Sequence, residues 1–162
     1  MSIPLYGQES NSQGAGLDNK VGPVIRCTGA AAVSLTASQS GALIVIAGGA
    51  NGAAAVNLPS CKGLNGLEYT FILQAANGTG DFDIDAKDGA EYFLGPLACN
   101  EAADSTFTAF NGSSHDQLTL VASKGAAGDM IKLRSLDGKW LIAGSIVNDM
   151  DGWVVGTASA NT

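Results

Sequence analysis

The stretch GDMIKLRSLDGKWLIAGS, residues 128–145, carries the clearest fold signal in this chain. In its first half Met130, Lys132 and Arg134 alternate with Ile131, Leu133 and Ser135. In its second half Trp140 and Ile142 alternate with Lys139, Leu141 and Ala143. Between the halves, Asp137-Gly138 supplies the positive φ angles that a two-residue turn between right-twisted strands requires. The stretch therefore predicts a β-hairpin with Trp140 as a core anchor on its inward face.

The same kind of pattern continues on both sides of this hairpin. From Val21 onward, apolar segments recur at a spacing of roughly 8–12 residues, with turn residues between them. We expect strands near 24–27, 31–36, 42–47, 54–58, 67–75, 81–85, 90–94, 105–110, 117–122, 129–136, 139–146 and 152–157. A helical turn is a further possibility at 60–65 or 99–104, between the expected strands. Regular spacing of this kind favours an all-β fold: an antiparallel β-sandwich, jelly-roll-like, or a barrel.

The length and composition suit one β-rich domain. The chain has 162 residues, of which 46% are apolar and only 6% aromatic, and it contains 22 glycines. A core of small and aliphatic residues with many turns fits a β fold better than a helical bundle. We assign residues 21–162 to a single domain.

Residues 1–20 are polar and rich in Gly, Ser and Gln, apart from the apolar cluster Ile3, Pro4, Leu5 and Tyr6. Such a segment is too short to form structure alone, so we expect an extended N-terminal arm. It is either a frayed terminus or a partner-binding segment that becomes ordered on a neighbouring subunit through its apolar cluster.

The charge distribution argues against nucleic acid as a partner. The net charge is −7, and residues 81–162 hold twelve acids and five bases. A phosphate backbone needs a cationic footprint, which this sequence does not supply. We expect neither a signal peptide nor a membrane-spanning segment, because no basic region precedes an apolar one and no uninterrupted apolar run is long enough.

Metal binding and catalysis find little support in the sequence. Cys27, Cys61 and Cys99 are far apart, and His115 is the only imidazole, so we expect reduced buried thiols and no metal site or cofactor. The acids of Asp81-Phe82-Asp83-Ile84-Asp85 resemble a calcium loop in spacing but lack its later glycine and glutamate. Their strict alternation predicts a strand with the carboxylates outward.

The sequence gives even less support to nucleophilic catalysis or to cleavage of glycosidic bonds. No G-x-S-x-G elbow accompanies His115, which lies in a polar turn, and the aromatic platforms that hold sugars in glycosidases are scarce. We therefore expect no enzymatic activity and assign no catalytic residue.

The order of segments resembles a pattern found in virion proteins of tailed bacteriophages. The segments are VSLTASQSGALIVIAGG (33–49), AAAVNLPS (53–60), GLEYTFIL (66–73), DIDAKDGAEYFLG (83–95) and the hairpin at 128–145. Asn57-Leu58-Pro59 and Asp137-Gly138-Lys139-Trp140 are the most specific points. In this pattern the chain is most similar to the capsid decoration, or cement, proteins of marine and cyanobacterial phages.

The resemblance implies a β-rich protein, often a homotrimer, that is made in the host bacterial cytoplasm and lies on the outer surface of the capsid. There it would bind between subunits of the major capsid protein and stabilise the head, with no nucleic acid or membrane partner. The alternative is a phage fibre, spike or host-binding component, and a non-viral carbohydrate-binding or adhesion module is a third reading. Trp153 is expected either in the core or in a subunit contact.

Overall fold

The computed structural model describes residues 22–28, 31–47, 54–76, 78–87, 89, 91–98, 107–111, 114–146 and 153–156. Within these ranges the protein is all-β: twelve strands are joined by turns, and the one helical element is a single 3₁₀ turn, η1 (Ala37–Gln39). The strands lie close to the positions that the sequence predicts. The segment 60–65 contains turns and no helix, and 99–104 lies outside the described residues.

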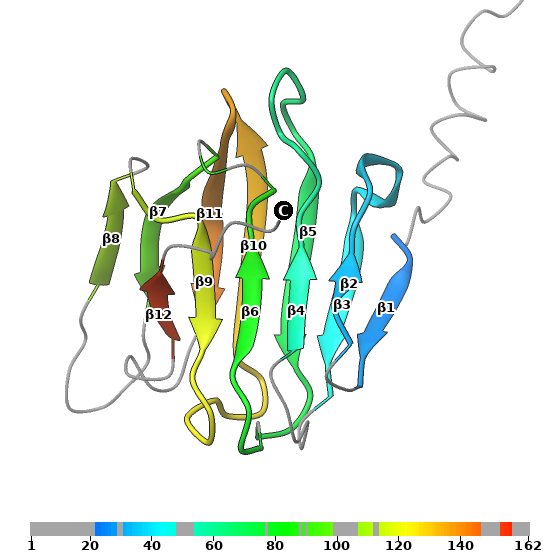
Figure 1. Ribbon diagram of the computed structural model, residues 1–162, viewed down its shortest axis with the longest axis vertical. Helices are drawn as coiled ribbons and strands as arrows, with labels where there is room; N and C mark the ends of the chain where they lie inside the picture. Colours follow the sequence, from blue (N-terminus) through cyan, green and yellow to red (C-terminus); the bar gives the residue numbers. More distant parts are fainter. Residues whose placement is uncertain are drawn as a thin grey trace, which may run out of the picture.

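The larger sheet has seven strands (Figure 1). Their order is β1 (Val24–Cys27), β3 (Ala42–Ile46), β5 (Glu68–Leu73), β10 (Met130–Leu136), β11 (Lys139–Ile146), β7 (Phe93–Ala98) and β8 (Phe107–Asn111). The smaller sheet has five, in the order β12 (Trp153–Gly156), β9 (Gln117–Leu120), β6 (Phe82–Asp85), β4 (Ala54–Asn57) and β2 (Val33–Ser34).

The first six strands alternate between the two sheets, so the chain winds as a short coil. β1, β3 and β5 are parallel neighbours in the larger sheet, and β2, β4 and β6 are parallel neighbours in the smaller one. The register places Val33 beside Val56, 23 positions later, and Val56 beside Ile84, 28 positions later. Each turn of the coil therefore stacks equivalent residues of successive turns, as in solenoid proteins.

This winding corrects the expectation of an antiparallel fold. Five of the ten strand pairings within the described residues are parallel, so both sheets are mixed. Most of the connections between successive strands carry the chain to the other sheet. It then re-enters its first sheet in the original direction. Neither sheet closes on itself in the described parts of the chain, so the barrel alternative is wrong there.

Both sheets contribute to one cluster of buried apolar side chains. In the larger sheet one aligned row consists of Ile25, Ile44, Phe71 and Ile131. In the smaller sheet the corresponding row consists of Val33, Val56, Ile84 and Leu118. Aliphatic side chains stacked across neighbouring strands exclude water efficiently, and each fully buried one contributes about 1.5–3 kcal/mol.

The hairpin predicted for residues 128–145 is present. β10 and β11 pair antiparallel with Leu136 opposite Lys139 and Ser135 opposite Trp140. The turn residues Asp137 and Gly138 have φ angles of 50° and 73°. Positive φ at both central positions matches the twist of the flanking strands, and this is the physical reason for Asp-Gly at this point.

Candidate functional site

The predicted hairpin residues Asp137 and Trp140 make contacts that stabilise the fold. Asp137 is clasped by Asn65: the Asp137 backbone N–H donates to Asn65 Oδ1 at 2.8 Å, and Asn65 Nδ2 donates to Asp137 Oδ1 at 3.3 Å. Trp140 is 0% exposed and packs on Tyr69 with a ring-centroid distance of 5.7 Å. These contacts hold the β10–β11 hairpin against β5 and against the loop that precedes β5.

Trp153 lies in the core of the chain and not on its surface. It is 4% exposed, and its indole Nε1 donates to Asp129 Oδ2 at 3.4 Å. Of the two expectations for this residue, the structure therefore supports the core position. The arm residues Ile3, Pro4, Leu5 and Tyr6, with the whole 1–20 segment, lie outside the described residues.

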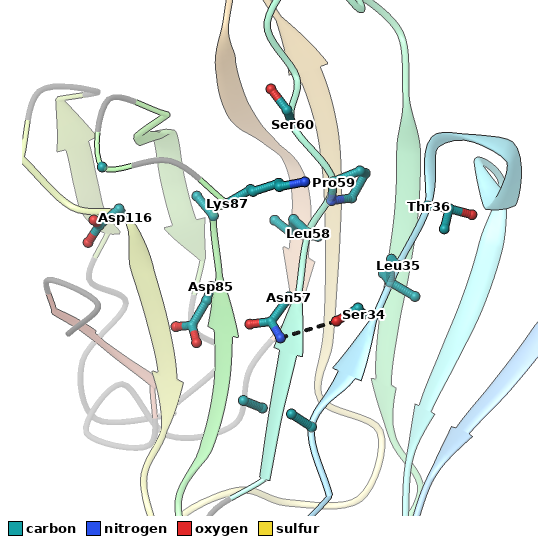
Figure 2. A pocket seen from close by; sticks show the side chains of 14 residues that line it. Ser34, Leu35, Thr36, Asn57, Leu58, Pro59, Ser60, Asp85, Lys87 and Asp116 are labelled. Carbon is teal, nitrogen blue, oxygen red and sulfur yellow. Dashed lines mark hydrogen bonds between the residues drawn. The ribbon is translucent and has the colours of Figure 1, made fainter. Parts of the chain in front are cut away.

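A large groove lies on the outer face of the smaller sheet (Figure 2). Its volume is about 1120 Å³, slightly above the roughly 300–1,000 Å³ typical of ligand sites. Strands β2, β4 and β6 and the segments that follow them supply most of its lining. The polar side chains among the lining residues are Ser34, Thr36, Asn57, Ser60, Asp85, Lys87 and Asp116. This groove is the candidate functional site.

The polar side chains of the groove form a row because the coil stacks them. Ser34, Asn57 and Asp85 are register partners on β2, β4 and β6. Asn57 Nδ2 donates to Ser34 Oγ at 3.4 Å, and Gln117 Nε2, on β9, donates to Asp85 Oδ1 at 2.8 Å. Neighbouring strands are about 4.8 Å apart, so the row presents polar groups at a regular interval across the sheet.

Equivalent backbone hydrogen bonds recur along one edge of this row. The N–H of Leu35 donates to the Asn57 carbonyl at 2.9 Å, and the N–H of Leu58 donates to the Asp85 carbonyl at 2.8 Å. Leu35 and Leu58 are buried beneath the groove, at 4% and 1% exposed. The floor is therefore a fixed part of the core, and the polar row is held on a rigid base.

The carboxylates on this face are held in an unfavourable environment. Burial raises the pKa of Asp85 above its ordinary value, the hydrogen bond from Gln117 opposes this shift, and the charges of Asp83 and Asp116 add to it. Burial also raises the pKa of Asp83, against the hydrogen bond from Thr119. As expected from the sequence, Phe82 and Ile84 point inward between these acids.

The raised pKa values of Asp83 and Asp85 predict that removing the two charges stabilises the fold, by an amount that depends on pH. Replacing Asp83 and Asp85 together with asparagine should raise the free energy of unfolding at pH 7. The amide keeps an oxygen that can accept the bonds from Thr119 and Gln117, and it has no charge to desolvate. The wild-type folded state binds protons more tightly than the unfolded one, so the wild type loses stability as the pH rises from 3.8 through the raised pKa values.

Urea titrations at pH 7 and at pH 3.5 measure this difference directly. The advantage of the double variant should be present at pH 7 and much smaller at pH 3.5, which lies below the ordinary carboxyl pKa of 3.8, so most of the wild-type carboxyls are protonated in both states. An equal advantage at both pH values would show that the effect comes from packing and not from charge.

Metal ions in proteins are bound mainly by groups of His, Cys, Asp and Glu side chains. Within the described part of the chain, no group of three or more His, Cys, Asp or Glu side chains could hold a metal ion. His115 lies in the turn before β9 with a half-buried side chain, and its carbonyl accepts the Phe93 N–H at 2.8 Å. The polar side chains that line the groove can bind a ligand through hydrogen bonds.

A second buried carboxylate lies close to the groove and was not anticipated from the sequence. Glu91 is 0% exposed and accepts hydrogen bonds from Ser60 Oγ at 2.5 Å and from the Cys61 N–H at 3.1 Å. Burial, together with the charge and hydrogen bond of Glu91, raises the pKa of the Cys61 thiol to about 12. Cys61 and Cys27 are buried and unbridged, and Cys99 lies outside the described residues.

No protein-family model, curated protein or solved structure matches this chain. Among the described residues, the structure contains no helix that is long and apolar enough to cross a membrane.

Proposed function

We propose that this chain is a structural virion protein, a capsid decoration protein that binds the outer surface of a phage head and stabilises it. Its partner would be the major capsid protein, and its two sheets would form the layers of a β-sandwich within a homotrimer. The arm at residues 1–20 would lie along the shell or a neighbouring copy. The proposal rests on the sequence pattern and on the surface of the larger sheet.

The motifs that carry the sequence resemblance have packing roles. Leu58, in Asn57-Leu58-Pro59, is 1% exposed and its N–H continues the ladder to β6. Asp137-Gly138 makes the hairpin turn, and Trp140 fills the core beside it. Motifs of this kind define a scaffold, so the function of the protein is expected to come from its surfaces.

The outward face of the larger sheet is the observation that favours attachment to a protein shell. One aligned row across it consists of Val24, Leu43, Thr70 and Lys132, and the next consists of Arg26, Val45, Ile72 and Met130. Val24 is 53% exposed, whereas Lys132 pairs with Glu68 at 2.8 Å. Aliphatic rows bordered by charged groups are typical of protein interfaces. Weak contacts of this kind gain strength when they are repeated over a particle.

Co-sedimentation tests the proposal. The purified full chain should pellet with isolated expanded heads of its phage and should not bind host cells. Val24→Glu should weaken head binding, because it places a charge on the proposed contact face. Ser34→Glu is the matched control: it puts the same charge on an exposed position of a short strand at the edge of the other sheet, and it should leave head binding unchanged.

Two outcomes would contradict this function. One is failure of the full chain to bind heads at any concentration, with binding to cells instead. That result would favour the alternative of a fibre, spike or host-binding component. The other is loss of head binding in Ser34→Glu with full binding in Val24→Glu, which would assign the contact to the opposite face.

A further inference from the structure

The groove on the smaller sheet is built for a ligand with many hydroxyl groups. Asp85 is only 6% exposed, and the one hydrogen bond that the described residues give its carboxylate is from Gln117 to Oδ1. Oδ2 is left as a strong acceptor at the groove. Carboxylates of this kind accept short, charge-assisted hydrogen bonds from hydroxyl donors.

Two side chains that can donate hydrogen bonds also line the groove. Lys87 extends across the groove toward Pro59 (Figure 2). Two strands away on β2, the Ser34 hydroxyl accepts a bond from Asn57, which fixes its oxygen and leaves its hydrogen to donate. Ser34, Asn57 and Asp85 therefore stand along one line across three strands, and Lys87 lies two residues beyond Asp85 along the chain.

The apolar part of the lining is made by Leu35, Leu58, Pro59 and small alanine side chains. The ring of Pro59 lies beside Lys87 and above the buried side chain of Leu58 (Figure 2). A ring face of this size can pack against the C–H groups of a sugar.

The charges at the groove restrict the ligand further. Asp85 and Asp116 both line it, so a phosphate backbone or a polyanionic glycan would be repelled. Metal-mediated binding has no support in the described residues, which offer no group of three ligands. Backbone addition of a peptide strand could not use β4 or β6, because each pairs with a strand on both sides, and would be limited to the edge strand β2.

We propose that this groove is a binding site for a neutral oligosaccharide. Asp85 accepts hydrogen bonds from adjacent sugar hydroxyls, Lys87 and Ser34 donate to hydroxyl oxygens, and Pro59 packs against the face of one ring. A chain of hexoses lying across the strands meets successive members of the polar row. The site is independent of attachment to heads, which uses the opposite sheet.

Titration calorimetry with defined sugars tests this inference. The full chain is titrated with neutral hexasaccharides of glucose, mannose and galactose, and with a galacturonic acid hexasaccharide as the anionic comparison. At least one neutral sugar should bind with a measurable Kd, and the anionic sugar should bind at least tenfold more weakly. No binding of any neutral sugar at millimolar concentration would overturn the proposal.

Variants locate the binding in the groove. Asp85→Asn and Lys87→Ala should each weaken sugar binding about tenfold or more, because each removes a charge-assisted hydrogen bond. Asp83→Asn is the matched control, since Asp83 lies on the same face of the same strand and outside the groove lining, and its Kd should be unchanged. Equal losses in Asp83→Asn and Asp85→Asn would overturn the assignment of the site.

The same variants separate this inference from the proposed function. Asp85→Asn and Lys87→Ala should pellet with heads as the wild type does. If they lose head binding while no sugar binds, the groove is a protein contact and the oligosaccharide proposal is wrong. If the wild type binds a sugar but no heads, the proposed capsid function fails and the groove assignment holds.

Discussion

Replacing Trp140 with alanine should lower the free energy of unfolding by about 3–5 kcal/mol. Trp140 is the largest fully buried side chain in the described residues, and it packs against Tyr69 at the centre of the larger sheet. Truncation removes its apolar surface from the core and leaves a cavity that the flanking strands β10 and β7 cannot fill. Equilibrium urea unfolding followed by circular dichroism measures the loss.

Phenylalanine variants separate packing from hydrogen bonding. The indole Nε1 of Trp140 is buried and has no hydrogen-bond partner among the described residues, so Trp140→Phe keeps much of the packing and loses none of the bonds described. Its cost should be well below that of the alanine variant. Trp153→Phe additionally loses the bond to Asp129 and should cost about 1–3 kcal/mol more than a pure packing change. A Trp140→Ala change within about 0.5 kcal/mol of wild type would place the residue on the surface.

The second large effect is expected at Glu91. Glu91→Ala should lower the free energy of unfolding by about 3 kcal/mol, because it removes the acceptor of two hydrogen bonds and strands the buried Cys61 N–H. It should also lower the pKa of the Cys61 thiol, since the charge and hydrogen bond of Glu91 contribute to its raised value. Urea unfolding gives the first quantity, and the pH dependence of thiol labelling gives the second.

Glu91→Gln is the informative control. Glutamine keeps an oxygen that can accept from Ser60 or from the Cys61 N–H, so it should restore most of the stability while still lowering the Cys61 pKa. Loss of stability in the glutamine variant equal to that in the alanine variant would show that charge, and not hydrogen bonding, holds this segment.

Strand positions could be predicted from the sequence because they depend on local alternation. The segments Ala42–Ile46 and Glu68–Leu73 have the expected bounds to within two residues, since apolar side chains at period two define one buried face. Strand directions could not be predicted in this way. Whether residues 28–32 turn the chain back or carry it to the other sheet depends on packing between segments that are distant in sequence.

The candidate groove was missed for the same reason. Ser34, Asn57 and Asp85 come together through pairing across 23 and 28 positions, which no local pattern contains. A signal is nevertheless present: Val33-Ser34-Leu35, Val56-Asn57-Leu58 and Ile84-Asp85-Ala86 repeat one apolar-polar-apolar triplet. A search for weak internal repeats would have aligned these triplets and indicated the parallel coil. Glu91 gave no such signal, because a single acid in a short predicted strand is usually exposed.

The most direct test of the proposed function is a pair of electron cryomicroscopy reconstructions of expanded heads, one without this protein and one with it at saturation. A capsid decoration protein should give extra density on the outer surface of the shell, between capsid subunits. The two sheets should fit this density with the outward face of β1, β3 and β5 against the shell. Identical reconstructions, or extra density confined to the tail, would contradict the proposed function.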